Sequence, residues 1–305
     1  MIELGLAACA SVAWGASDFA AGVAARRRSV LVVLAASQCT GLVLAMLALA
    51  LAGASAPSGP ALLSAALAGA FEAIGFGALY AALARGPMGV VAPAAALGGV
   101  IPLASGVIGG ERLGMLAATG CIAALVAVVL VSREPADGRT QPGLAPGLSL
   151  ALLSAAAFGL FFLFLDLAAD EAPFIWGVAI ARATAVVLVV PVLTWHVVRR
   201  RSRGSALAVS PGSSERPRAG GESGSSWVAA REVGALAVVG VLDIAANLLF
   251  AWGASRADGP LVGVVGSTYP VFTVLLAAGL LGERLALTQR AGVVLALAAS
   301  ALIVL

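Results

Sequence analysis

One stretch of this sequence occurs twice, and it constrains the fold more than any other feature. The first copy, Arg85 to Leu113, reads RGPMGVVAPAAALGGVIPLASGVIGGERL, and the second, Arg256 to Leu285, reads RADGPLVGVVGSTYPVFTVLLAAGLLGERL. Both contain Gly-Pro, an apolar span interrupted by Gly and Pro, and a final Gly-Glu-Arg-Leu. The spacing of roughly 170 residues is far too long for a solenoid or propeller repeat. It indicates a chain built from two homologous halves.

The composition assigns these halves to a lipid environment. Hydrophobic residues make up 61% of the chain and charged residues 11%, whereas a soluble globular protein is about 25% charged. All eighteen basic residues are arginines that stand mostly in short loops and form no basic face, which excludes a nucleic-acid-binding protein. The three cysteines, Cys9, Cys39 and Cys121, lie inside apolar segments without metal-ligand or disulfide spacing.

The apolar sequence divides into segments long enough to cross a bilayer. A transmembrane helix needs about 20 residues to do so. The predicted spans are 4–24, 29–52, 60–83, 87–109, 113–132, 148–168, 174–197, 230–253, 260–281 and 286–305. The expected fold is an all-α membrane protein with ten transmembrane helices. Its first repeat covers 1–132, a polar connector covers 133–147, and the second repeat covers 148–305.

The two repeats align residue by residue over most of their length. One offset sets Ala13-Trp14-Gly15 against Ala157-Phe158-Gly159 and Gln38 against Arg182, and a second offset sets Glu72 against Asp243. Each half has an odd number of predicted spans, so the halves must have opposite orientations in the membrane. This is an inverted-topology repeat, a construction found in many secondary transporters.

The arginines predict the orientation in the membrane. Fifteen of them follow odd-numbered spans: Arg26, Arg27, Arg28, Arg85, Arg133, Arg139, Arg199, Arg200, Arg201, Arg203, Arg216, Arg218, Arg231, Arg284 and Arg290. Only Arg112 and Arg256 stand on the opposite side. The positive-inside rule places the richer side in the cytoplasm, so both termini are expected outside. The Arg-, Ser-, Gly- and Pro-rich stretch 199–227 is expected to be a disordered cytoplasmic loop.

With these features, the chain resembles the EamA family of the drug/metabolite transporter superfamily. The resemblance rests on Trp14-Gly15, on Gly86-Pro87 with Gly110-Glu111-Arg112, and on Gly259-Pro260 with Pro270 and Gly282-Glu283-Arg284. It covers all of the chain except the loop 199–227. It implies ten helices in an inverted repeat, a central cavity lined by helices one, three, four, six, eight and nine, and transport of small metabolites or drugs.

The chain departs from the familiar pattern of the family in two ways. Members often have a basic N-terminus and cytoplasmic termini, whereas the arginines here argue the reverse. The first half also has Gly98 where the second has Pro270, and Pro93 and Pro102 flank that position. The break in the fourth helix is therefore expected at a different place from the break in the ninth.

Ionisable residues within the predicted spans are the leading site candidates, because each costs at least ~2.5–3.5 kcal/mol in a bilayer. They are Asp18, Glu72, Arg182 and Asp243, with Asp166 at a helix end. One interpretation is structural, in which Arg182 neutralises one carboxylate and the others are protonated. The other is functional, in which a carboxylate binds a cation or a proton. Because there is one arginine for three acids, the functional interpretation is slightly favoured.

Further polar and aromatic residues are candidate substrate- or proton-binding groups: Asn247, Gln38, Tyr80, Trp14, Thr268 and Tyr269. Asn247 follows Asp243 by four residues and so shares its helix face. For each residue alone, packing or interhelical hydrogen bonding is the simpler role. Glu111-Arg112 and Glu283-Arg284 are interpreted as structural, with the acid favouring a helix start.

The sequence thus predicts a secondary transporter that works by alternating access, an exporter coupled to the proton gradient, in the cell inner membrane. No Walker sequence, metal-ligand cluster or cofactor motif is present, so no ATP, metal or cofactor is expected. The expected partners are a small-molecule substrate, the lipid bilayer and protons, and the sequence assigns no oligomeric state. A passive channel or facilitator is the alternative. An intramembrane enzyme is a weaker one, because the chain lacks a nucleophile with a base.

Overall fold

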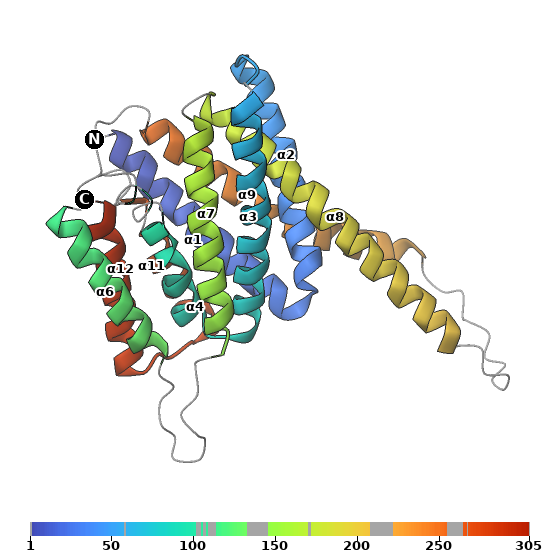
Figure 1. Cartoon of the computed structure of the whole chain (residues 1–305). Coiled ribbons are helices and arrows are strands. Elements are labelled where there is room, and N and C mark those ends of the chain that lie inside the picture. The colour runs from blue at the N-terminus through green and yellow to red at the C-terminus, as the bar shows by residue number, and fades with distance from the viewer. Residues whose placement is uncertain are drawn as a thin grey trace.

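The computed structural model describes residues 2–57, 59–101, 105, 108, 114–132, 146–169, 172–207, 222–254, 265, 266 and 268–304. Within these ranges the chain is helical and contains no strand. The elements are α1 (Ile2–Arg27), α2 (Val30–Ala52), α3 (Gly59–Arg85), α4 (Met88–Ala95), the 3-10 helix η1 (Ala96–Gly99), α6 (Met115–Ser132), α7 (Leu148–Ala169), α8 (Phe174–Leu207), α9 (Glu222–Ala254), α11 (Tyr269–Leu281) and α12 (Leu287–Val304). Figure 1 shows them as a bundle.

Six helical segments of the described chain are long and apolar enough to cross a membrane. They lie in α1, α2, α3, α7, α8 and α9. Their outer faces carry large exposed apolar side chains, such as Leu51, which is 81% exposed, and Val43, which is 67% exposed. Soluble monomers rarely expose apolar patches of this extent. The chain is therefore a multi-pass, all-helical membrane protein.

Within the described residues, the helices interrupted by Gly and Pro, α4 and α11, each cover part of a predicted span. α4 contains Pro93, and after Ala95 the chain tightens into η1, which includes Gly98. In the second half, α11 begins only at Tyr269 with Pro270 in its first turn, where a missing N–H costs nothing. At the offset that pairs Gly98 with Pro270, η1 aligns with Thr268 and the first residues of α11, so the described residues do not show the expected difference in position between the two breaks. Pro102, Gly259-Pro260 and Gly110 to Leu113 lie outside the described residues.

The predicted disordered loop 199–227 needs correction at both ends. α8 continues to Leu207 and α9 already begins at Glu222, and Figure 1 shows α8 extending past the rest of the bundle. Arg, Ala and Leu are good helix formers, which favours a helix that extends beyond its apolar part. Residues 208–221, like most of the connector 133–147, lie outside the described part.

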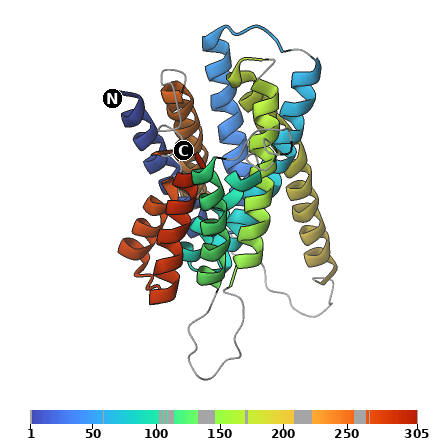
Figure 2. The same ribbon diagram turned by 60° about the vertical axis from the view of Figure 1, so that its left-hand side comes forward.

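Helices of the two halves pack against each other in matching pairs. α3 lies along α7 and contacts α8, while α1 lies along α9, which also contacts α2. Three further pairs join elements at equivalent places in the two halves: α2 with α8, α4 with α11, and α6 with α12. Figures 1 and 2 show α6 and α12 side by side, at one edge of the bundle in Figure 1. Each half therefore buries its helices against the other half rather than only against itself.

Two glycines allow close contacts between helices of the two halves. A Cβ on Gly69 of α3 would lie 2.3 Å from the carbonyl oxygen of Ala181 and 2.8 Å from the Cβ of Thr184 on α8. A Cβ on Gly240 of α9 would lie 2.5 Å from the carbonyl oxygen of Ser37 and 2.8 Å from the Cβ of Thr40 on α2. These distances leave no room for a side chain, so the backbones approach as they do at small-residue helix interfaces in membranes.

The two contacts use equivalent residues. The offset that aligns Gln38 with Arg182 also aligns Ser37 with Ala181 and Thr40 with Thr184, and the offset of Glu72 and Asp243 aligns Gly69 with Gly240. The same local packing therefore occurs twice, with the halves exchanged.

Candidate functional site

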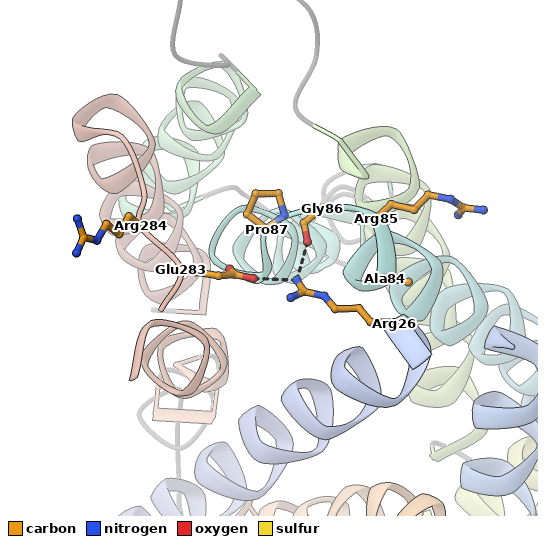
Figure 3. Close-up of a pocket in the computed structure, with 7 residues that line it drawn as sticks. All are labelled: Arg26, Ala84, Arg85, Gly86, Pro87, Glu283 and Arg284. Carbon is orange, nitrogen blue, oxygen red and sulfur yellow. Dashed lines mark hydrogen bonds and ion pairs between the residues drawn. The ribbon is translucent and has the colours of Figure 1, made fainter. Parts of the chain in front are cut away.

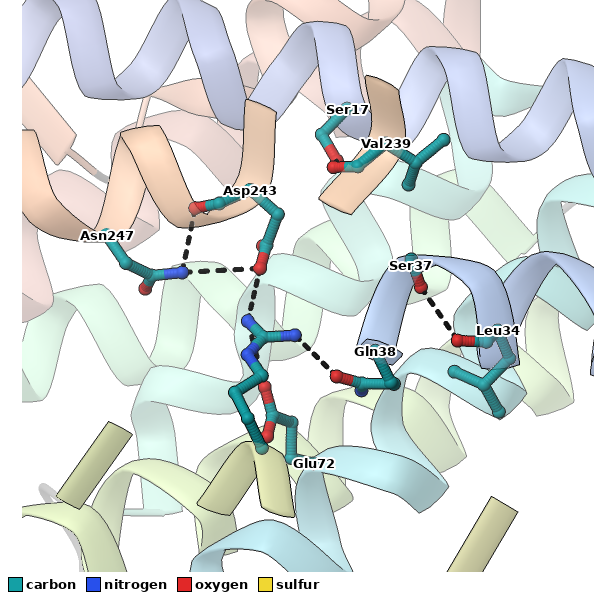
Figure 4. A network of polar contacts seen from close by, with 9 residues as sticks. Ser17, Leu34, Ser37, Gln38, Glu72, Val239, Asp243 and Asn247 are labelled. Atoms are coloured by element: carbon teal, nitrogen blue, oxygen red, sulfur yellow. Dashed lines mark hydrogen bonds and ion pairs between the residues drawn. The ribbon is translucent and has the colours of Figure 1, made fainter. Parts of the chain in front are cut away.

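A buried polar network lies where four helices meet. It consists of Gln38 on α2, Glu72 on α3, Arg182 on α8 and Asp243 on α9. Their exposed fractions are 0%, 1%, 3% and 4%. In Figure 4, Gln38, Glu72 and Asp243 converge from separate helices. These are the two aligned pairs of the sequence, Gln38 with Arg182 and Glu72 with Asp243, gathered at one place.

Arg182 is the centre of the network. Its Nη1 donates to Oε1 of Gln38 at 2.6 Å, and its Nη2 lies 3.0 Å from Oε1 of Glu72. Nη2 also donates to Oδ2 of Asp243. The guanidinium carbon stands 5.5 Å from the centroid of the Phe76 ring, a cation–π contact. A planar guanidinium with five donors suits this role, since it can reach several acceptors at once.

The network carries more negative than positive charge when both carboxyls are ionised. Among the described residues, Arg182 is the only buried base, and it serves Glu72 and Asp243 together. Three buried atoms have no hydrogen-bond partner within the described chain: Nε2 of Gln38, Oε2 of Glu72 and Nε of Arg182. A partly satisfied network in a low-dielectric interior is costly. It therefore has both charge and hydrogen-bonding capacity left for a proton or a ligand.

The residues next to the network hold it in position. Asn247, one helical turn after Asp243, donates from Nδ2 to the Asp243 carbonyl at 2.8 Å and lies 3.3 Å from its Oδ2. A Cβ on Gly41 would lie 3.3 Å from Cδ of Arg182, so a small residue makes room for the arginine stem. Asn247 was predicted from its spacing, and the structure places it against the carboxylate.

Asp18 lies apart from Arg182. Its side chain is on α1 and only 7% of the residue is exposed, yet it makes no hydrogen bond or ion pair with any other residue that the structure describes. It is close enough to Asp243 for the two carboxylates to repel each other. One turn before it, the Trp14 ring lies 5.4 Å from the Phe250 ring and 6.2 Å from the Tyr269 ring, centroid to centroid.

The other predicted site residues have local roles. The Thr268 hydroxyl donates to the Val265 carbonyl at 2.7 Å, within its own turn. Tyr80 is buried in the apolar core, where its ring lies 5.5 Å from that of Phe76. Asp166 is exposed on α7. The structure therefore brings Gln38, Glu72, Arg182, Asp243 and Asn247 together, groups Trp14 and Tyr269 near Asp18, and leaves Thr268 out of both groups.

A second polar cluster, the Arg26 corner, was not predicted as a site. Nη2 of Arg26, at the end of α1, forms an ion pair of 2.8 Å with Oε1 of Glu283 and donates to the Gly86 carbonyl at 3.0 Å, while its Nε donates to the Leu83 carbonyl at 3.1 Å. Oε2 of Glu283 accepts from the backbone N–H of Gly89 at 3.3 Å. Figure 3 shows the contacts of Arg26 with Glu283 and Gly86. These residues line an open pocket of about 350 Å³, together with Arg85 and Arg284.

The Arg26 corner refines one expectation from the sequence. Glu283 was expected to favour a helix start, and it does lie at the first turn of a helix, where a carboxylate is favourable. That helix is α4 of the other half, however, and not the helix that follows Glu283 in the chain. The equivalent residues Glu111 and Arg112 lie outside the described part.

Small hydroxyl side chains between helices were also missed. Ser11 lies 2.6 Å from the Val265 carbonyl, Ser17 donates to Val239 at 3.0 Å, and Ser154 donates to Gly75 at 2.9 Å. Thr273 donates to the Gly15 carbonyl at 3.1 Å. Such bonds stabilise helix pairs in a membrane. No sequence signal separates these residues from serines that bond within their own helix.

The fold and the buried network define the class first: an all-helical, multi-pass membrane protein with an arginine shared between two carboxylates in its interior. The comparison with family models then identifies the family. The model of the EamA-like transporter family matches residues 145–305, more than half of the chain, so the protein belongs to that family of transporters. No curated protein matches the chain. Within the described residues no cluster of His, Cys, Asp and Glu could hold a metal ion.

Proposed function

We propose that the protein is a secondary transporter that exports a small metabolite or drug-like molecule by alternating access, driven by the proton gradient. The observation that carries this proposal is the position of Arg182 between Glu72 and Asp243. Arg182 lies on α8 and forms ion pairs with Glu72 on α3 and Asp243 on α9. When both carboxyls are ionised, one negative charge is not balanced by the arginine. Intramembrane acids at the interface of two halves are where transporters of this kind bind substrates and coupling ions.

The proposed architecture is ten transmembrane helices in two inverted five-helix repeats, 1–132 and 148–305, joined by 133–147. Three observations support it: the residue-by-residue alignment, the packing of helices in pairs with the halves exchanged, and the matching contacts of Gly69 and Gly240. An interface that uses equivalent residues from both sides permits two related arrangements, in which the roles of the halves are swapped. Alternating access requires such a pair of states.

The proposed location is the cell inner membrane, with both termini outside. The bias of the arginines supports this orientation, and Arg26, Arg85 and Arg284 line the same pocket although they are far apart in the sequence. An alkaline phosphatase fusion at Leu305 should therefore be active and a fluorescent-protein fusion there dark. The opposite pattern would reverse the orientation without affecting the transport mechanism.

A proton can act on this network by changing which helices Arg182 holds. With both acids ionised, the guanidinium attracts α3 and α9 at once. A proton on Glu72 or Asp243 removes one attraction, and the arginine then pairs with the remaining carboxylate alone. Because the two acids stand on equivalent helices of opposite halves, the position of the proton biases one half against the other. This couples proton binding to the relative placement of the halves.

The test is transport by proteoliposomes that contain the purified protein. Labelled candidate compounds are offered with and without an imposed pH gradient, and proton flux is followed with an internal pH dye. The variants Glu72→Gln and Asp243→Asn keep side-chain size, so each should fold. At least one should bind substrate yet fail to concentrate it.

The matched control is Asp166→Asn, an exposed acid on a helix of the same bundle, which should concentrate substrate like the wild type. If both network variants also do so, the acids are structural and the coupling proposal is wrong. Flux that follows the substrate gradient alone, with no response to pH, supports the passive facilitator instead.

A further inference from the structure

We propose that Asp18, together with the rings of Trp14, Phe250 and Tyr269, binds the positively charged group of an organic cation, which makes such cations the substrate class. The inference rests on the proposed transport function and adds to it the chemistry of the cargo. It uses residues outside the Arg182 network. The site is called the Asp18 site below and consists of these four residues.

The first argument is the missing partner of Asp18. The residue is 7% exposed and makes no hydrogen bond or ion pair with the rest of the described chain. The one buried base among the described residues, Arg182, is shared by Glu72 and Asp243. An acid inside a membrane protein normally pairs with a base or with backbone groups, and one that does neither indicates a substrate or ion path. Asp243 repels Asp18 and is itself paired with Arg182, so it supplies no positive charge to Asp18.

The second argument is a set of aromatic rings centred on Trp14, which lies on the same face of α1 as Asp18. Trp14 stands one turn before Asp18 on α1, so both side chains share a helix face. Its ring contacts Phe250 of α9 and Tyr269 of α11, at centroid distances of 5.4 Å and 6.2 Å. Tyr269 also lies within electrostatic range of Asp18. All three rings are partly exposed, in contrast to the fully buried Tyr80. The site thus combines one carboxylate with aromatic rings from three helices.

The combination selects a particular ligand chemistry. Ring faces attract ammonium groups with apolar substituents, which is how proteins recognise quaternary ammonium compounds. Ca²⁺ and Mg²⁺ instead require several oxygen ligands, and Asp18 supplies the only carboxylate of this site. An anion would meet the Asp18 carboxyl, while Arg182, the one buried base of the described chain, is already paired with Glu72 and Asp243. An organic cation fits both parts of the site.

The first test uses the wild-type protein alone. Choline, its neutral carbon analogue 3,3-dimethylbutan-1-ol and the similarly shaped anion 3,3-dimethylbutanoate are titrated into the detergent-purified full chain by calorimetry. Choline should bind at least tenfold more tightly than the neutral analogue, and the anion should give no signal. Equal binding of choline and the neutral analogue, or no binding of choline at all, overturns the inference.

The second test uses matched variants. Asp18→Asn should weaken choline binding at least tenfold, whereas Asp18→Glu should keep part of it. Trp14→Leu should weaken binding severalfold. The controls are Asp166→Asn and Trp195→Leu, an exposed acid and an exposed ring on other helices, which should bind choline like the wild type. Unchanged binding by Asp18→Asn overturns the inference, and if that variant does not fold, the comparison of the three probes on the wild type decides.

Failure here is distinguishable from failure of the proposed function. If choline does not bind but Glu72→Gln or Asp243→Asn abolishes pH-driven accumulation of another compound, the transporter proposal stands and the substrate class is wrong. If choline binds at the Asp18 site but no compound is ever concentrated against its gradient, the binding site stands and the coupling proposal is wrong.

Discussion

Two arginines each form an ion pair with a carboxylate of the opposite half of this protein, and the surroundings of the two ion pairs differ. The Arg182 side chain is 4% exposed, and it bonds to Gln38, Glu72 and Asp243. The Arg26 side chain is 31% exposed and its partner Glu283 is 15% exposed. In the interior, water cannot take over a lost partner, so removal of one ion leaves the others uncompensated. At the helix ends water and salt can replace it. The same chemical contact is therefore expected to matter strongly in one place and weakly in the other.

The largest effect is expected from Arg182→Ala. The change leaves Glu72 and Asp243 buried without a counterion, and breaking a buried pair costs about 3–5 kcal/mol. The melting temperature in detergent and the folded yield should fall sharply, while Arg85→Ala, which removes an exposed arginine, should leave both unchanged. Unchanged stability with lost transport would instead make Arg182 a substrate-binding residue.

A triple variant sharpens the same point. Arg182→Gln combined with Glu72→Gln and Asp243→Asn removes every charge of the network and keeps a polar side chain at all three positions. Since the cost of Arg182→Ala comes from uncompensated acids, the triple variant should recover most of the lost melting temperature. A triple variant as unstable as Arg182→Ala would show that packing of the arginine, including its contact with Phe76, is what stabilises the interior.

The next effect in size concerns the two close contacts between the halves. Gly69→Ala and Gly240→Ala each place a methyl group within 2.5 Å of a backbone oxygen, so the helices must separate. Overpacking of this kind costs about 1–3 kcal/mol, and the two losses in melting temperature should be similar because the contacts are equivalent. Gly279→Ala on α11, where nothing lies within 4 Å, should be neutral or slightly stabilising. Clearly unequal losses at 69 and 240 would argue against equivalent interfaces.

The smallest effect on stability is expected from Arg26→Gln. Partly exposed ion pairs contribute about 0.2–1 kcal/mol, and salt screens them. The melting temperature should fall by a few degrees at most, and the difference from the wild type should shrink at high salt. Arg27→Gln, the adjacent arginine, is the control. A large, salt-independent loss would mean that the Arg26 corner behaves like the interior network.

The sequence predicted the members of the interior network better than their arrangement. The offsets pair Gln38 with Arg182 and Glu72 with Asp243, and the i, i+4 rule places Asn247 beside Asp243. Whether four such residues meet depends on how each helix is rotated about its axis, which is decided by contacts such as those of Gly69 and Gly240. Composition and alignment do not contain that information.

The contacts of the Arg26 corner could not be predicted from the sequence, for a related reason. Arg26 and Glu283 are 257 residues apart, and each also fits a simpler role, one as a cytoplasmic charge and the other in a turn. The break at η1 was partly predictable, because Pro93 and Gly98 weaken a helix locally. The helical ends of the stretch 199–227 were not, since a disorder estimate from composition averages over a whole segment.

The sharing of Arg182 has a consequence for how the chain is made. Glu72 enters the membrane with the first half, before Arg182 has been synthesised, and an acid at membrane depth costs ~2.5–3.5 kcal/mol. Glu72 is therefore expected to be protonated or partly hydrated in the bilayer until α8 is inserted. Asp243 follows Arg182 and meets its counterion on arrival. The nascent first half thus holds Glu72 without its counterion, and the insertion of α8 supplies it.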